Sequence, residues 1–193
     1  MGRPKNEKLK AKIAKVAREQ FRELGYDGTS YSSIAKACGI SRNLVQYHFP
    51  KKQLLAIDFM EDVLARSRDS LGLSDAELAG DFAAITEIGC RFFEWLLGKG
   101  GYARFLADVI RDRDLTGEVL AFNAGWALKR SGAASGDVPD DVMRTVVTHM
   151  GGFYELLYFC LKKGLPFDVR AELPPVVKAF EDALAGTRHL SIA

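Results

Sequence analysis

Residues 32–49 contain two short apolar stretches separated by a glycine, and this pattern restricts the possible fold more than any other feature of the chain. Apolar residues recur at helical spacing before Gly39, which can adopt the left-handed backbone that closes a helix without steric cost. Ser41 is a typical capping residue, so a second helix is expected to begin one short turn later and to end before Pro50. The segment predicts a helix-turn-helix, whose second helix enters the major groove of DNA.

Positive charge is concentrated around this motif. Residues 1–52 hold 12 Lys and Arg against 4 Asp and Glu, a net charge of +8, whereas the remaining residues hold 15 against 21, a net charge of −6. A run of charge alone would indicate only a solvated helix face. Because the positive charge of residues 1–52 surrounds the motif, it is expected to neutralise DNA phosphates.

Further residues around the motif agree in order and spacing with a known pattern. They are Gly25-Tyr26, Thr29-Ser30, Ile34-Ala35, Cys38-Gly39-Ile40-Ser41, Tyr47-His48-Phe49 and Lys52. Through them, residues 8–56 resemble the DNA-binding domain of the tetracycline-repressor (TetR) family of bacterial regulators. The resemblance implies an all-α homodimer that represses transcription from a palindromic operator and is released by a small hydrophobic effector.

The second helix of the motif is expected to read bases. Arg42 can pair bidentately with guanine and Asn43 with adenine, and Gln46 offers the same donor and acceptor one turn later. A solvated polar side chain is the alternative for Gln46. Asn43 and Gln46 depart from the family, which usually has glycine and tyrosine at these positions.

The resemblance assigns phosphate contacts to residues on both sides of this helix. Tyr47 and His48 are similar to a phosphate-contacting pair, and Lys52 would form an anion site with the first N–H groups of the next helix. Thr29 and Ser30 are expected to cap the first helix of the motif and to contact phosphate. Capping alone is the alternative for these two residues, and a packed core position is the alternative for His48.

The rest of the chain shows helical spacing and no alternating strand pattern, which predicts an all-α fold of about nine helices. We expect a DNA-binding head over residues 1–50 and a larger effector-binding and dimerisation domain over residues 51–193. A long helix that begins at Lys52 would connect the two, because its apolar positions continue through Val63 and Leu64 into the second domain.

Helix boundaries follow from capping and helix-breaking residues. The first helix is expected to end at Gly25, and the capping box at residues 74–77 to begin a fifth helix. Asp137 would cap a long helix that ends at Gly164, and Pro174-Pro175 would open the last helix.

Two surfaces are expected in the second domain, an effector pocket because aromatic residues are concentrated there and a dimer interface because the resemblance implies one. The expected effector pocket is lined by Phe92, Trp95, Phe105, Phe122, Trp126, His149 and Phe153. The expected dimer interface is formed by Tyr154, Leu157, Tyr158, Leu161, Val177, Phe180 and Leu184. Ordinary core packing is the alternative for the aromatic residues among them.

No motif predicts catalysis, a metal or a cofactor. Cys38, Cys90 and Cys160 lack metal-ligand spacing and are typical of buried thiols. The chain has no zinc-protease helix and no phosphate-binding loop, which argues against the rival hypothesis of a helical-bundle enzyme. A constitutive DNA-binding protein without an effector is the second rival. The absence of a signal peptide and of a long apolar segment predicts a cytoplasmic protein.

Overall fold

The computed structural model describes residues 6–74, 81–112, 115, 117 and 140–188. These residues form α-helices and no strand, which confirms the all-α prediction. The helices are α1 (Glu7–Gly28), α2 (Tyr31–Cys38), α3 (Arg42–His48), α4 (Lys52–Leu71), α6 (Phe82–Leu97), α7 (Gly100–Val109), α9 (Asp140–Lys163) and α10 (Val169–Arg188). The described helices number eight, close to the nine expected.

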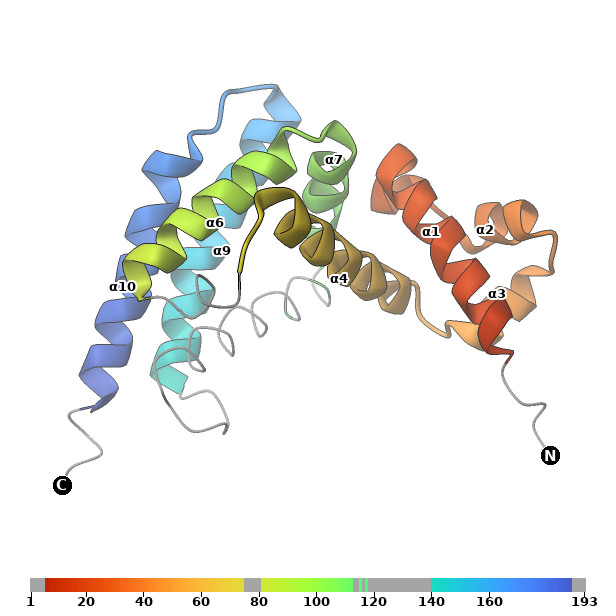
Figure 1. Ribbon diagram of the computed structural model, residues 1–193, viewed down its shortest axis with the longest axis horizontal. Helices are drawn as coiled ribbons and strands as arrows, with labels where there is room; N and C mark the ends of the chain where they lie inside the picture. Colours follow the sequence, from red (N-terminus) through yellow and green to blue (C-terminus); the bar gives the residue numbers. More distant parts are fainter. Residues whose placement is uncertain (1–5, 75–80, 113–114, 116, 118–139, 189–193) are drawn as a thin grey trace.

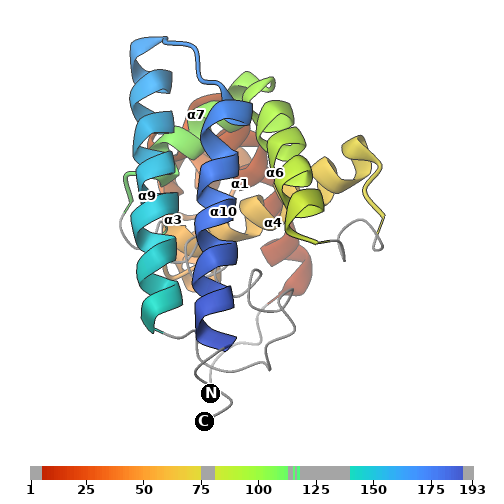
Figure 2. The ribbon, with the colours of Figure 1, turned by 90° about the vertical axis from the view of Figure 1, so that its left-hand side faces the viewer.

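The molecule is elongated, with the head of α1, α2 and α3 at one end (Figure 1). Helix α4 leads from the head towards the body, as its apolar positions predict, and ends at Gly72 in a left-handed conformation with φ of 62°. Helices α9 and α10 run side by side at the end away from the head, as Figure 2 shows. No helix among the described residues is long and apolar enough to cross a membrane.

Helix α1 is interrupted at Gly25, where the sequence predicts its end. The φ and ψ angles of Gly25 are 79° and 179°, and one further turn continues to Gly28. A Cβ atom at Gly25 would collide with the Asp108 carboxylate and would crowd Arg104, both on α7. The glycine is therefore needed for its backbone conformation and for the close approach of α7.

The prediction that Pro174-Pro175 opens the last helix is wrong. Helix α10 begins at Val169, and both prolines lie inside it. Asp168 caps the helix, because its Oδ1 accepts hydrogen bonds from the backbone N–H groups of Arg170 at 3.0 Å and Ala171 at 3.2 Å. This cap fixes the first turn before the prolines are reached.

One apolar cluster joins the head to the body. Phe21 of α1, Phe59 of α4 and Phe105 of α7 pack together, with ring centroids 5.8 Å apart for Phe21 and Phe59 and 4.6 Å apart for Phe59 and Phe105. The same cluster includes buried residues of α2 and α3. The head helices and the first body helices therefore share a core across residue 50.

A second cluster lies between α6, α9 and α10. Phe93 and Phe153 meet edge to face with centroids 5.0 Å apart, and Leu157 is fully buried beside them. The three cysteines are buried and unpaired by disulfides. Burial raises the pKa of the Cys38 and Cys90 thiols, which keeps them protonated.

Candidate nucleic-acid interface

Hydrogen bonds at each helix end fix the turn between α2 and α3. Ser30 and Ser33 form a reciprocal capping box, in which Ser30 Oγ accepts from Ser33 N at 3.1 Å and Ser30 N donates to Ser33 Oγ at 3.0 Å. Gly39 has φ of 67° and closes α2. Ser41 Oγ accepts from Leu44 N at 3.3 Å and so caps α3, as the sequence predicts. The helix-turn-helix is thus locally determined.

The base-reading candidates lie together on the exposed side of α3. Arg42 and Asn43 are exposed in its first turn, and Gln46 follows one turn later with partial exposure. Val45 is fully buried and anchors the opposite side. Tyr47 is 44% exposed next to them. Helix α3 therefore presents donors and acceptors at its N-terminal end, where a recognition helix contacts base edges.

Two of the predicted phosphate-contacting side chains are buried in the protomer. Thr29 is 1% exposed, and its hydroxyl donates to Gly25 O at 2.8 Å, which stabilises the break in α1. His48 is 4% exposed and packs edge to face against Tyr47, with Nδ1 lacking a hydrogen-bond partner within the described part of the chain. Neither side chain lies on the surface that DNA would contact. Ser30 remains exposed, with its hydroxyl engaged in the capping box.

Lys52 is also turned away from the expected phosphate site. Its Nζ donates to Tyr26 O at 2.5 Å and lies 3.9 Å from the centroid of the Tyr26 ring. Burial lowers the pKa of Lys52, while Asp27, Asp108 and Asp112 partly oppose this change. Lys52 therefore links α4 to the end of α1, and its ammonium is directed at Tyr26.

The neighbouring Lys51 takes the position that sequence reasoning gave to Lys52. Lys51 is exposed and is the N-cap residue of α4, which has no side-chain cap. The N–H groups of the first turn and the Lys51 ammonium together form a site suited to a phosphate. The sequence shows two adjacent lysines, but only the rotational position of each residue on α4 decides which of the two side chains is exposed.

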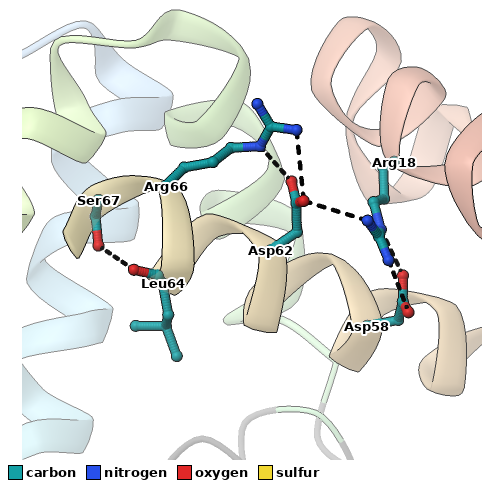
Figure 3. Close-up of polar contacts among 6 residues, drawn as sticks. All are labelled: Arg18, Asp58, Asp62, Leu64, Arg66 and Ser67. Atoms are coloured by element: carbon teal, nitrogen blue, oxygen red, sulfur yellow. Dashed lines mark hydrogen bonds and ion pairs between the residues drawn. The ribbon is translucent and has the colours of Figure 1, made fainter. Parts of the chain in front are cut away.

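An ion-pair network holds α1 against α4 (Figure 3). Arg18 donates to both oxygens of Asp58 at 2.7 and 3.1 Å and to Asp62 Oδ1 at 3.2 Å. Arg66, one turn after Asp62, donates to the same carboxylate at 2.5 Å. The Asp58 hydrogen bond is the largest cause of a raised Arg18 pKa. The network sets the orientation of the head on the helix that leads into the body.

Further polar contacts join α1 to α7. Asp112 accepts hydrogen bonds from Tyr26 Oη at 3.2 Å and from Gln53 Nε2 at 3.4 Å. Arg104 donates to Glu23 O at 2.9 Å. Burial and, next, the charge of Asp112 raise the pKa of Tyr26, so its hydroxyl stays a donor. The position of the head is therefore linked to α7 as well as to α4.

The five predicted effector residues that the structure describes do not gather at one site. Phe105 belongs to the core shared by head and body, and Phe153 to the core of α6, α9 and α10. His149 is exposed on α9, whereas Phe92 and Trp95 are partly buried on α6. Of these, Trp95 lines an open cleft between head and body. Phe122 and Trp126 lie outside the described residues.

Most of the predicted dimer residues lie inside the protomer. Tyr154, Leu157, Val177 and Phe180 are buried inside the protomer, because α9 and α10 turn these side chains towards each other and towards α6. Tyr158 and Leu161 are partly buried, and the Leu184 side chain lies outside the described part of the chain. Tyr154, Leu157, Val177 and Phe180 therefore belong to the core of the body, with Tyr158 and Leu161 packed at its edge.

Helix α9 exposes apolar residues that sequence reasoning missed. Val147, Leu156 and Phe159 are 51%, 40% and 50% exposed. Between them, a Cβ atom at Gly151 or Gly152 would meet nothing within 4 Å. Gly152, Leu156 and Phe159 share one side of α9, which we call the apolar face of α9, whereas Val147 lies about 180° around the helix from Leu156. In the sequence, the signal of this face was hidden because α9 is apolar on more than one side.

Comparisons with known proteins agree with this geometry. Residues 13–58 match the family model described as bacterial regulatory proteins, tetR family. The chain is similar to the crystal structure of a tetR-family transcriptional regulator from Streptomyces coelicolor, with a TM-score of 0.57 and 18% sequence identity over 98% of this chain and 85% of that chain. No curated protein matches the sequence. Residues 13–58 therefore carry the DNA-binding motif of the tetR family of bacterial regulatory proteins, and the chain as a whole shares the fold of the Streptomyces coelicolor regulator.

Proposed function

We propose that this regulator binds an inverted-repeat operator as a homodimer and represses transcription from it. The observation that carries the proposal is the exposure of Arg42 and Asn43 at the start of a capped α3 in the basic head. Two such helices, one from each protomer, match successive major grooves about 34 Å apart when the two half-sites are one helical turn apart. Lys51, Tyr47 and the first turn of α4 supply phosphate contacts around them.

The test compares base reading with phosphate binding. Fluorescence anisotropy with operators selected from random DNA measures affinity at several salt concentrations. We expect the logarithm of the affinity to fall linearly with that of salt, by about 0.9 for each neutralised phosphate. Arg42→Ala and Asn43→Ala should each remove about 1–3 kcal/mol of discrimination at one base pair. Binding that is independent of salt, or unchanged operator preference in both variants, would contradict the proposal.

The homodimer would form through the apolar face of α9. Leu156 and Phe159 support this assignment because these two large apolar side chains, three residues apart on one side of α9, are otherwise left to water. Gly152 would let the partner helix approach closely. In a two-fold symmetric pair, each face packs against its own copy.

Release by a small-molecule effector is the remaining part of the proposal. It is supported by the contacts that join the head to two body helices, from Arg18 to Asp58 on α4 and from Glu23 O to Arg104 on α7. A ligand that repositions either body helix would change the separation of the two recognition helices. A thermal-shift screen followed by an operator-release assay on each stabilising compound tests this part. If stabilising compounds leave operator affinity unchanged, the body serves dimerisation alone.

A further inference from the structure

An open cleft of about 490 Å³ lies between the head and the body. Its lining includes Arg22 from α1, Arg66 and Asp69 from α4, and Trp95, Lys99 and Tyr102 from the end of α6 and the start of α7. This volume is within the range of small-molecule sites in proteins, about 300–1,000 Å³. The cleft is separate from the exposed side of α3 and from the apolar face of α9.

The charges around the cleft favour an anion. Arg22, Arg66 and Lys99 line it against the single carboxylate of Asp69, which leaves a net charge of +2. Arg66 is paired with Asp62, whereas Arg22 and Lys99 are exposed and have no ion pair with any described residue. Two cations on facing elements are thus available to a ligand.

The start of α7 adds to the positive potential. Helix α7 has ten residues, and its N-cap residue Lys99 makes no side-chain cap. Gly101, in this first turn, lines the cleft, and a Cβ atom there would collide with the carbonyl oxygen of Arg22. The positive end of the α7 dipole therefore lies at the cleft, where α1 and α7 approach each other closely.

Aromatic rings form another part of the wall. Trp95 and Tyr102 are stacked, with centroids 5.2 Å apart and an angle of 29° between the ring planes. Trp95 is only partly buried, so part of its indole is left open to the cleft. A flat ring system of a ligand would stack there while its charged group faces Arg22 and Lys99.

We propose that this cleft binds a planar aromatic anion, such as an aryl carboxylate, between the head and the body. The ligand class differs from the apolar effector that the sequence suggested, because the cleft combines an aromatic wall with unpaired cations. Since α1 forms one wall and body helices form the others, the bound anion would tie the head to the body. This regulatory consequence rests on the proposed function, whereas binding itself does not.

The experiment uses 2-naphthoate as the probe and its uncharged counterpart 2-naphthamide as the comparison. The chain has two tryptophans, so Trp126→Phe leaves Trp95 as the sole indole reporter. We expect 2-naphthoate to quench Trp95 fluorescence saturably and 2-naphthamide to bind roughly tenfold more weakly, the loss typical of one charge-assisted hydrogen bond. Isothermal titration of the unmodified protein gives an independent affinity.

Charge variants on both sides of the cleft make the test specific. Arg22→Gln and Lys99→Gln should each weaken 2-naphthoate binding roughly tenfold and leave 2-naphthamide unaffected. Asp69→Asn should tighten 2-naphthoate binding several-fold, because it removes the opposing carboxylate. Lys163→Gln is the matched control, since Lys163 is exposed at the end of α9 and does not line the cleft. Circular dichroism checks that each variant is folded.

Three results would overturn the proposal: no 2-naphthoate binding at millimolar concentration, equal affinity for the amide, or equal losses in Arg22→Gln and Lys163→Gln.

Operator affinity measured with and without saturating 2-naphthoate then tests the coupling of the cleft to the head. An altered affinity that Lys99→Gln abolishes supports the coupling, and an unaltered one refutes it. A chain that binds no operator in either condition contradicts the proposed function but not the ligand site.

Discussion

Two adjacent lysines at the start of α4 have opposite environments. Lys51 is exposed beside the uncapped first turn, while Lys52 is held over the Tyr26 ring. In sequence they are equivalent, and family resemblance favours Lys52 as the phosphate contact. The residue scale is therefore where pattern-based reasoning is weakest, because a shift of one position on a helix turns a side chain through about 100°.

This difference gives a first prediction. Lys51→Gln should weaken binding to all DNA sequences and reduce the salt slope by about one, since one phosphate contact is lost. Lys52→Gln should leave the slope unchanged and lower the free energy of unfolding instead, because a hydrogen bond to Tyr26 O is lost. Anisotropy over a salt series and urea unfolding measure the two effects. The opposite pattern would restore the phosphate role of Lys52.

Gly25 gives a second prediction at the same scale. Gly25→Ala places a side chain at φ of 79° and against the Asp108 carboxylate, so we expect a loss of about 1–3 kcal/mol in the free energy of unfolding. Gly72→Ala is the matched control, because Gly72 has φ of 62° and open space around the added Cβ. Urea denaturation should show a clearly larger loss for Gly25→Ala. Equal losses would mean that the contact with α7 contributes nothing.

At the scale of elements, the sequence predicts those helices whose ends carry a local signal. Ser41 and Gly39 fix the limits of α3 and α2, and both were identified correctly. The start of α10 was missed because two prolines were a stronger signal than the Asp168 cap before them. The exposed side of α9 was also missed: Leu156 and Leu157 are adjacent apolar residues, and only packing against α6 and α10 decides which is buried.

Arg170 joins two of these elements and gives a third prediction. On α10, it donates to Glu87 at 2.8 Å and to Glu94 at 2.6 Å, both on α6. The hydrogen bond from Arg170 lowers the pKa of Glu87 below its ordinary 4.5. A carboxylate with a lowered folded-state pKa stabilises the fold above the unfolded pKa, and this stability is lost as the pH falls through the folded pKa.

Thermal unfolding between pH 6 and pH 3 tests this linkage. Below about pH 4.5, the melting temperature of the unmodified protein should fall further than that of Arg170→Gln, because Glu87 has no guanidinium partner in the variant. The difference should be small, because these groups are exposed and screened by solvent. Lys163→Gln, which removes an exposed charge from the end of α9, should follow the unmodified protein. Parallel curves for all three proteins would show that the ion pairs do not persist in solution.

For the whole molecule, the division into head and body is the least predictable feature. Sequence periodicity indicates separate helices, and the charge change near residue 52 suggests a boundary there. The packing of Phe21, Phe59 and Phe105 crosses that boundary, as does the hydrogen bond between Tyr26 and Asp112. Such contacts join residues far apart in the chain, so no local sequence pattern predicts them. The base-reading candidates were predictable because all of them belong to one capped helix.

Binding to a palindromic operator depends on the formation of a homodimer, and the last prediction concerns this association. Phe159→Glu places a charge in the apolar face of α9, where burial against a second copy would leave it desolvated and unpaired. We expect the variant to be monomeric at micromolar concentration in analytical ultracentrifugation, with its helical content and melting curve little changed, because Phe159 is half exposed in the protomer.

Leu24→Glu is the matched control, since Leu24 is 47% exposed on α1 in the head. It should remain dimeric. A palindromic operator multiplies two half-site affinities when the protomers are linked, so the monomeric variant should bind a full operator only about as tightly as a single half-site. If Phe159→Glu stays dimeric and keeps full operator affinity, the protomers associate through another surface and α9 is exposed for a different reason.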